Sequence, residues 1–501
     1  MTADLVMAVD QGTSSTRAIV YDGTWSEVAS ASRTLTTDHP RPGWSEQAPE
    51  AILSSVVDVV GEVLAAVGGP RHIAALGITN QGETVVAWDN ATGAALGPAV
   101  LWSCRRSQPL VDRVAGAGHG PAIRELTGLP LDAYFSASKI RWLLEENPQV
   151  AAASTSDRLA VGTVDAWLTA RLGPRSQTDP STASRTQLFG LESLAWSEEL
   201  ARWWDVPLGA LPKVVPSVGE LGLMAHPSWG GALPLRAMLC DQQAALVGQG
   251  GFREGLIKAT LGTGVFVLAN AGDAVPGAPD GILVTVAWTD AGGRATYAFD
   301  GGVFSAGALL GFLHDGLGVI DDPRELDRLA AEVDDAAGVR ILPALAGVGA
   351  PWWEPDARGV IAGLSPVAGR ANVARAAIDA IAQRTADVVE ALNPGLADLG
   401  APLRVDGGLT ASHLLVERLA DILGRPVEVA AASESTALGV ALMAAIGAGR
   451  LTEREAAGVA ATAQRVEPRL AERERLSQRA AWRTFVRRAV ELDQPAGDLV
   501  P

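Results

Sequence analysis

Two turns that contain a Gly-Thr pair, each lying between two strand-like runs, constrain the fold of this chain more than any other feature. The first turn is Asp-Gln-Gly-Thr-Ser-Ser at residues 10–15, and the second is Gly-Thr-Gly at residues 262–264. A short turn between two apolar runs is typical of a β-hairpin. The second Gly-Thr pair follows the first by 250 positions in a chain of 501 residues, which favours two related halves. The flanking strand-like runs are residues 5–9, 17–21, 255–261 and 265–269.

Helical and strand-like periodicities alternate along both halves. Such alternation predicts an α/β fold. We place the boundary near residues 248–252, which gives a first domain at 1–250, a second at 251–490 and a flexible tail at 491–501. The expected helices are residues 51–67, 138–146, 323–333, 371–392 and 414–423. The expected strands outside the hairpins are residues 74–78, 85–88, 282–288 and 427–429.

Composition and charge exclude several classes of function. Hydrophobic residues make up 48% of the chain and charged residues 19%, which suits a globular protein. The formal net charge of −17 argues against nucleic acid as a partner. The two cysteines, Cys104 and Cys240, provide no disulfide framework and fit a reducing compartment. The sequence has neither a signal-peptide pattern nor an apolar run of membrane-spanning length, so we expect a cytoplasmic protein.

The turns have the chemistry of a phosphate site. Small residues there expose backbone N–H groups and hydroxyls, and Asp10 is placed to hold Mg²⁺ directly or through water. An ordinary hairpin turn without a ligand is the alternative interpretation. It becomes less probable because both halves of the chain contain the same Gly-Thr turn. A third glycine turn, Val-Asp-Gly-Gly at residues 405–408, lets the backbone approach a ligand closely. The sequence contains no P-loop, no protein-kinase motif set, no zinc-binding spacing and no G-x-S-x-G.

Several polar and aromatic residues have both a structural and a functional interpretation. Asp241 precedes a run of small residues, where an acid caps a helix as readily as it acts as a base. Glu83 follows a strand, where a solvated loop residue is more common. Trp102 and Tyr134 are, by themselves, more typical of a core or a surface than of a ligand wall. Taken one at a time, these residues favour the structural interpretation.

Taken together and in order, these stretches resemble the FGGY family of carbohydrate kinases, and most closely its glycerol kinase branch. The similarity covers about residues 4–450. Any one motif is weak, but a dozen motifs in the same order make chance an implausible explanation. The matching stretches are residues 10–17, 42–44, 77–83, 102–106, 132–142, 162–168, 178–189, 241–249, 262–266, 347–359, 406–427 and 434–441.

The resemblance implies two ribonuclease-H-like domains of the actin and hexokinase type with a cleft between them. It implies ATP and Mg²⁺ bound mainly on the second domain and a small polyol or sugar bound on the first. Asp241 is implied as the general base and Asp10 as the residue that organises Mg²⁺. The implied polyol pocket is Glu83, Trp102, Tyr134, Asp241, Gln242 and Phe266. The implied nucleotide site is Thr13, Ser14, Ser15, Arg17, Thr263, Gly307 and Gly408, with Gly311 and Ser412 towards the adenine.

Those residue types suit phosphoryl transfer to a polyol. Carboxylates and amides bind hydroxyls, while aromatic faces cover the carbon chain. In a loose transition state the attacking hydroxyl loses its proton late, so a carboxylate of ordinary pKa serves as the base. The family also implies a homodimer or homotetramer, and the sequence selects neither.

Three departures from the family pattern bear on the substrate and on regulation. Glycerol kinases usually have Arg-Glu where this chain has Gly82-Glu83. Losing hydrogen bonds from that arginine costs roughly 1.5–3 kcal/mol, and glycine opens volume for a longer ligand. Gly311 and Ser412 replace a frequent Gln and Asn. Residues 228–235 lack an arginine that some bacterial relatives use for an allosteric sugar bisphosphate, so we expect no such regulation.

Two hypotheses about the substrate follow. The first is ATP-dependent phosphorylation of glycerol to glycerol 3-phosphate. The second, for which Gly82 is the main support, is a kinase for a larger polyol or ketose of the erythritol, pentitol, xylulose or ribulose type. A sugar-sensing scaffold without activity is disfavoured, because Asp10, Thr13, Asp241 and Thr263 are all present.

Overall fold

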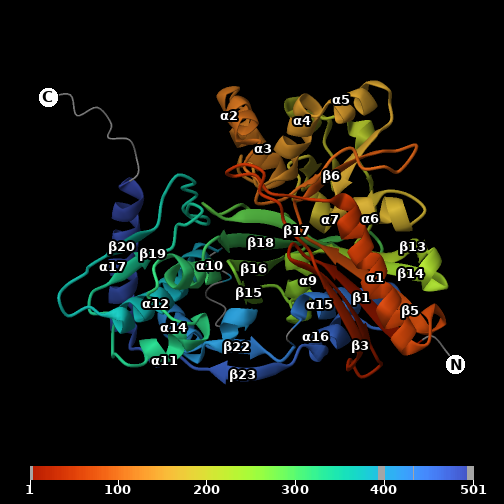
Figure 1. Cartoon of the computed structure of the whole chain (residues 1–501). Helices are drawn as coiled ribbons and strands as arrows, with labels where there is room; N and C mark the ends of the chain where they lie inside the picture. Colours follow the sequence, from red (N-terminus) through yellow and green to blue (C-terminus); the bar gives the residue numbers. More distant parts are fainter. Residues whose placement is uncertain (1–3, 393–395, 397–400, 433, 493–501) are drawn as a thin grey trace.

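A mixed β-sheet from the first half of the chain forms one part of the centre of the molecule (Figure 1). The structure is a computed structural model, and it describes residues 4–392, 396, 401–432 and 434–492. The strand order of this sheet is β13-β14-β5-β1-β2-β3, with β1 antiparallel to β2 and parallel to β5. The strands are β1 Leu5–Gln11, β2 Ser15–Tyr21, β3 Glu27–Thr34, β5 Ile73–Asn80, β13 Val218–His226 and β14 Gly231–Cys240.

A second mixed sheet, from the second half, repeats this arrangement. Its strand order is β17-β18-β16-β15-β21-β22-β23, with β15 antiparallel to β16 and parallel to β21. In both sheets a central hairpin continues on one side into antiparallel strands and on the other into two parallel strands, followed by an antiparallel edge strand. The strands are β15 Ile257–Leu261, β16 Val265–Gly272, β17 Leu283–Thr289, β18 Ala295–Val303, β21 Leu403–Asp406, β22 Val427–Ala430 and β23 Thr462–Val466.

The two sheets confirm the predicted α/β fold with two related halves. Both predicted hairpins are present: Asp10 pairs with Arg17 beside the first turn, and Leu261 pairs with Val265 beside the second. The antiparallel and parallel connections differ because a short turn joins only antiparallel strands, whereas parallel strands need a longer crossover.

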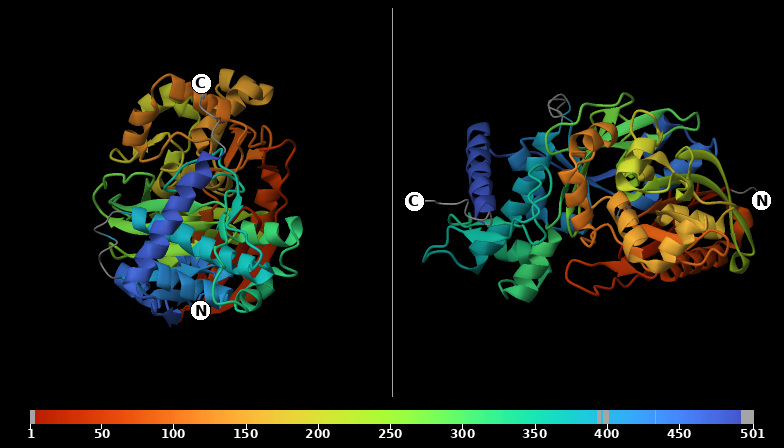
Figure 2. Two further views of the ribbon diagram at one scale, coloured as in Figure 1. Left: turned by 90° about the vertical axis from the view of Figure 1, so that its left-hand side faces the viewer. Right: turned by 90° about the horizontal axis from the view of Figure 1, so that it is seen from above.

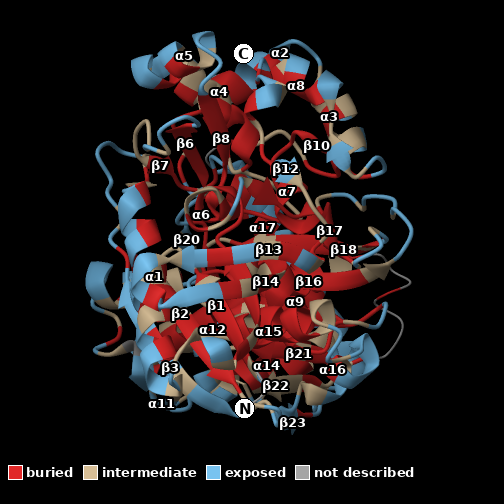
Figure 3. Ribbon diagram, turned by 90° about the vertical axis from the view of Figure 1, so that its right-hand side faces the viewer, coloured by how far each residue is buried: buried red, intermediate tan, exposed pale blue. Residues whose placement is uncertain are grey.

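Helices cover the faces of both sheets. The helices are α1 Pro49–Val67, α2 Gln108–Gly116, α3 Gly120–Thr127, α4 Ser136–Glu146, α5 Pro148–Thr155, α6 Val164–Leu172, α7 Pro180–Ala183, α8 Glu198–Trp204, α9 Asp241–Gly248, α10 Gly307–Gly311, α11 Leu326–Ala330, α12 Arg370–Ala391, α14 His413–Leu423, α15 Ser435–Gly447, α16 Glu453–Val459 and α17 Glu472–Glu491. Figure 3 shows that buried residues run through both sheets, while the outer face of α1 is exposed.

The expected helices agree with these bounds except at residues 323–333. There the chain forms a 3-10 turn, Pro323–Glu325, followed by the short α11. α17 lies at the outer edge of the second half (Figure 2) and includes Glu491, the first residue of the expected tail. Residues 493–501 of that tail lie outside the described residues. Within the described ranges, no helix combines the length and the apolar character that crossing a membrane requires.

The two halves meet where α9 and α15 cross. A Cβ atom at Gly439 would lie 1.8 Å from the backbone oxygen of Ala244, and one at Gly248 would lie 1.9 Å from that of Ser435. The helix backbones therefore touch directly, which only glycine allows at these two points. α15 also packs against β1, β5 and β14, so a helix from the second half covers the first sheet. This crossing fixes the start of α9, Asp241, relative to the second sheet.

Candidate active site

The turn after β1 is held by a network of glutamine side chains. Gln81 Nε2 donates to Gln11 Oε1 and to Gln47 Oε1, at 3.2 and 3.3 Å. Its oxygen accepts from the Thr13 hydroxyl at 3.3 Å, and Trp102 Nε1 donates to that hydroxyl at 2.9 Å. All three glutamines are buried. The network fixes the conformation of the predicted phosphate turn, in which Thr13 is half-buried, Ser14 exposed and Ser15 half-buried.

Asp10 carries uncompensated negative charge at the end of β1. Its carboxylate accepts no hydrogen bond from any of the described residues. Burial, and then the nearby Asp241 carboxylate, raise the pKa of Asp10 to about 7, although Arg17 opposes the shift. Arg17, predicted to contact phosphate, forms an ion pair with Glu434 just before α15. A carboxylate with this surplus of charge is a fitting ligand for a divalent cation, which would favour its ionised form.

Asp241 is the first residue of α9 and is only partly buried. Its Oδ1 accepts the backbone N–H of Gln242 at 2.6 Å, while Oδ2 has no hydrogen-bond partner among the described residues. Burial, followed by repulsion from Glu83, raises the pKa of Asp241 to about 6. One oxygen is therefore positioned by the helix start and the other is free to accept a proton.

A buried charge cluster surrounds Glu83. Arg185 Nε donates to Glu83 Oε1 at 2.7 Å, and Arg185 Nη1 lies 2.8 Å from Asp300 Oδ2 without the alignment of a hydrogen bond. The three side chains are 4%, 4% and 8% exposed. Burial opposes the charge of Arg185, but Glu83 and Asp300 together raise the pKa of the guanidinium. Sequence reasoning missed Arg185, although it lies within the matched stretch 178–189.

Aromatic side chains from both halves pack against one another near Glu83 and Asp241. The Trp102 ring meets Tyr134 at 5.7 Å and Phe266 at 6.4 Å between centroids, both edge-on. Phe304, which the sequence did not single out, lies 6.4 Å from Tyr134. Trp102 and Tyr134 belong to the first half and Phe266 to the second, so the structure brings three predicted pocket residues together across the junction.

The turn after β15 packs against the start of α10. The backbone N–H groups of Ala306 and Ala308 donate to Thr263 O, at 2.9 and 3.1 Å. A Cβ atom at Gly307 would lie 2.8 Å from Gly262 O, so the close approach requires glycine. The Thr263 side chain is exposed. The second predicted phosphate turn is therefore rigid in its backbone and open at its hydroxyl.

The remaining predicted nucleotide residues differ in their surroundings. Gly408 begins a 3-10 turn and has open space around it, as does Gly311 at the end of α10. Ser412 caps α14, since its hydroxyl accepts the Leu415 N–H at 3.1 Å and also bonds to Asp327. The Ser412 side chain therefore has structural partners in addition to its predicted contact with the nucleotide.

Gly82 has a specific neighbour. A Cβ atom at this position would lie 3.0 Å from Cys240 Sγ, which is closer than side chains normally pack. Cys240 Sγ in turn lies 3.7 Å from Asp241 Oδ1. Arg105 and Arg106, which follow Glu83 by about twenty positions in the sequence, pair with Asp132 and Glu46 instead of Glu83. The charge partner of Glu83 is therefore Arg185, from a distant part of the chain.

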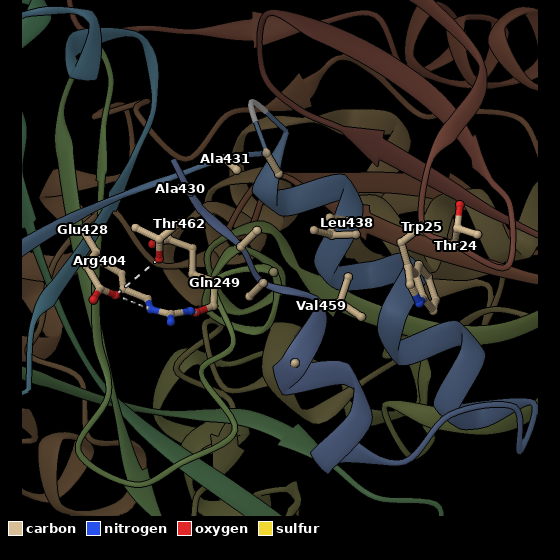
Figure 4. Close-up of a pocket in the computed structure, with 15 residues that line it drawn as sticks. Thr24, Trp25, Gln249, Arg404, Glu428, Ala430, Ala431, Leu438, Val459 and Thr462 are labelled. Atoms are coloured by element: carbon tan, nitrogen blue, oxygen red, sulfur yellow. Dashed lines mark hydrogen bonds and ion pairs between the residues drawn. The ribbon is translucent and has the colours of Figure 1, made fainter. Parts of the chain in front are cut away.

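A separate hollow of about 480 Å³ lies away from these residues (Figure 4). Trp25, Gln249, Arg404 and Glu428 are among the residues that line it. Trp25 follows β2, at the opposite end of that strand from Ser15. None of the lining residues belongs to the predicted site, so we assign the candidate active site to the junction around Asp241.

Comparison with known proteins places this geometry in context. Residues 5–248 match the model of the FGGY family of carbohydrate kinases, N-terminal domain, and residues 257–448 match that of the C-terminal domain. A glycerol kinase from Geobacter sp. is 42% identical over 487 residues, covering 97% of this chain and 98% of the relative. The crystal structure of Plasmodium falciparum glycerol kinase with ADP has a TM-score of 0.90 at 28% identity, covering 97% and 98% of the two chains. The structure of a xylulose kinase from Rhodospirillum rubrum shares the fold, with a TM-score of 0.84 at 24% identity. The match covers 97% of this chain and 100% of the xylulose kinase chain.

Proposed function

The chain belongs to the FGGY family of carbohydrate kinases, and from that premise we propose that it transfers the terminal phosphoryl group of ATP to glycerol. Membership in this family makes it an ATP-dependent kinase that acts on an alcohol. Glycerol as the acceptor is supported by the 42% identity, over nearly the whole of both chains, to a glycerol kinase. The product would be glycerol 3-phosphate.

The observation that carries the proposal is the free oxygen of Asp241 close to a cluster of aromatic rings. We propose that Asp241 Oδ2 accepts the proton of the attacking hydroxyl. Trp102, Tyr134 and Phe266 would cover the carbon chain, while Glu83 and Gln242 would bind the other hydroxyls. Holding the alcohol in line with the phosphate supplies most of the rate, because the transition state is loose.

The two Gly-Thr turns would hold the triphosphate from opposite halves. Thr13, Ser14, Ser15 and Arg17 would contact it from the first half. The proposed contacts from the second half are Thr263, Gly307 and Gly408, with Gly311 and Ser412 towards the adenine. Mg²⁺, when bound, would neutralise the charge of the phosphate oxygens, and Asp10 would hold it there. Arg17 would first have to exchange Glu434 for phosphate.

The alternative of a larger polyol or a ketose is not favoured. The xylulose kinase, at 24% identity, supports a common fold and no more. The absence of an arginine at position 82 does not leave Glu83 without a charge partner, because Arg185 donates to it at 2.7 Å. This contact orients Glu83, a residue of the proposed glycerol pocket.

An assay of ADP release at saturating ATP and Mg²⁺ tests the substrate. We expect kcat/KM to be highest for glycerol among glycerol, erythritol, xylitol, ribitol, xylulose and ribulose. Turnover of a longer substrate together with no turnover of millimolar glycerol would overturn the proposal. Asp241→Asn should abolish turnover while nucleotide still binds, as measured by calorimetry.

We also propose a cytoplasmic enzyme that assembles as a homodimer or homotetramer. Two free, buried cysteines, Cys104 and Cys240, are compatible with a reducing compartment. Light scattering of the purified protein would determine the number of subunits.

A further inference from the structure

Lys258 is fully buried at the junction between the two halves, next to the candidate active site. It lies on β15 and donates hydrogen bonds to three oxygens. These are Gln242 Oε1 at 2.7 Å, Thr260 Oγ1 at 3.1 Å and Phe266 O at 3.5 Å. An ammonium group has three N–H donors, so all of them are used.

Two of these three partners belong to the proposed polyol pocket, and they come from different halves of the chain. Gln242 lies in the first turn of α9, whereas Phe266 lies on β16. Lys258 therefore joins one wall of the pocket to the other.

The contact with Lys258 also decides which way the Gln242 amide faces. An ammonium group donates and does not accept, so the amide oxygen must face Lys258. The amide nitrogen then points the other way, and within the described part of the chain it has no hydrogen-bond partner. A side-chain NH₂ fixed in one orientation with both hydrogens free is a prepared donor for a hydroxyl oxygen.

Burying a lysine is costly unless the charge is compensated. Desolvation lowers the pKa of Lys258, and the carboxylates of Asp406, Asp300 and Asp241 oppose that shift. An apolar side chain of similar size would pack on β15 without this cost. The hydrogen bonds of its ammonium group therefore explain the presence of Lys258 better than a contribution to the stability of the fold does.

We propose that Lys258 is a positioning residue that fixes the Gln242 amide so that the pocket binds the polyol in a single orientation. The proposal rests on the proposed polyol kinase activity. Lys258 acts through Gln242 and does not touch the substrate itself. The proposal predicts that removing the ammonium group weakens polyol binding and leaves nucleotide binding unchanged.

Lys258→Met tests this prediction, because methionine fills the space of the lysine side chain without donating a hydrogen bond. We expect the KM for glycerol to rise by about 10- to 100-fold, the loss typical of a hydrogen bond that involves a charged group. The KM for ATP should stay within about twofold, and kcat should fall less than the glycerol KM rises. Lys213→Met, at an exposed lysine on β12 (Lys213–Val214), is the matched control and should leave both KM values unchanged.

A double-variant cycle separates positioning from a general structural effect. If Lys258 acts through Gln242, Lys258→Met combined with Gln242→Ala should bind glycerol no more weakly than Gln242→Ala alone. Fully additive losses would overturn the proposal, as would an equal rise in the KM for ATP. Gln242→Glu keeps an oxygen for Lys258 but lacks the NH₂ donor, so its glycerol KM should rise as in Gln242→Ala.

Two further measurements keep the outcome decisive. If Lys258→Met does not fold, Lys258→Gln is used; it retains a weaker donor, and its glycerol KM should rise by a smaller factor. An unchanged glycerol KM in a folded variant refutes the positioning role. If the unmodified chain does not phosphorylate glycerol but does phosphorylate a longer polyol, the same cycle is run with that substrate, so failure of the glycerol assignment is distinguished from failure of this inference.

Discussion

Arg185 Nε donates a 2.7 Å hydrogen bond to the carboxylate of Glu83, and both side chains are only 4% exposed. The two residues are about a hundred positions apart in the sequence, yet they form the charge pair at the centre of the candidate site. The pair gives Glu83 a cationic partner although position 82 is a glycine. It also makes the site sensitive to changes at Arg185, which lies within the protein and faces a second carboxylate, Asp300.

Arg185→Met should destabilise the fold and abolish activity. The change leaves Glu83 and Asp300 buried without their cation, which typically costs about 3–5 kcal/mol. Denaturant unfolding monitored by circular dichroism measures the loss. Arg33→Met, which breaks an exposed pair with Glu62, is the control and should cost at most about 1 kcal/mol. A loss for Arg185→Met no larger than that of the control would contradict the interpretation of a buried charge cluster.

The rate of phosphoryl transfer should fall at acidic pH. The base must be ionised, and the pKa of Asp241 in the free protein is raised to about 6, so kcat/KM should decline about tenfold per unit well below pH 6. Burial and the neighbouring Glu83 cause the shift. Glu83→Gln removes the second cause and should move the acidic limb of the kcat/KM profile to lower pH. A limb that stays in place would show that repulsion from Glu83 does not set this pKa.

Asp10→Asn should stabilise the free protein and weaken binding of the magnesium nucleotide. The folded-state pKa of about 7 is above the ordinary 3.8, so the stability linked to protonation of Asp10 is present below pH 3.8 and is lost as the pH rises through 7. At pH 8 the neutral amide should raise the free energy of unfolding by roughly 1–3 kcal/mol. Near pH 4 the difference should vanish.

Unfolding curves at the two pH values, together with calorimetry of nucleotide binding, check the effect of Asp10→Asn. Asp58→Asn, at an exposed position on α1, provides a comparison in which stability should change little at either pH. Equal stabilisation of Asp10→Asn at pH 4 and pH 8 would be inconsistent with a charge effect.

Gly82→Arg should lower kcat/KM for glycerol, contrary to the expectation from the family pattern alone. The new Cβ would lie 3.0 Å from Cys240 Sγ and would push the thiol towards Asp241. Combining Gly82→Arg with Cys240→Ala removes the obstructing sulfur, and we expect about tenfold recovery over the single variant. Steady-state kinetics with glycerol distinguishes the outcomes. A higher kcat/KM for glycerol in Gly82→Arg alone would mean that the Cys240 thiol moves aside without disturbing the site.

The order of motifs along the sequence was sufficient to predict the family, the two related halves and the two hairpin turns. These features depend on local patterns, because a turn between two strands is encoded in a few neighbouring residues. The roles of Asp10, Asp241 and the aromatic pocket residues were implied by the family resemblance, and they stay predictions.

Only the tertiary structure showed which residues interact across the junction. Arg185 reaches Glu83, Lys258 reaches Gln242, and Cys240 occupies the space beside Gly82 because distant strands and helices bring them together. Arg105 and Arg106 are much closer to Glu83 along the chain than Arg185 is, but they pair with Asp132 and Glu46. Charge compensation and steric contact depend on separation in space, and a single sequence records only separation along the chain.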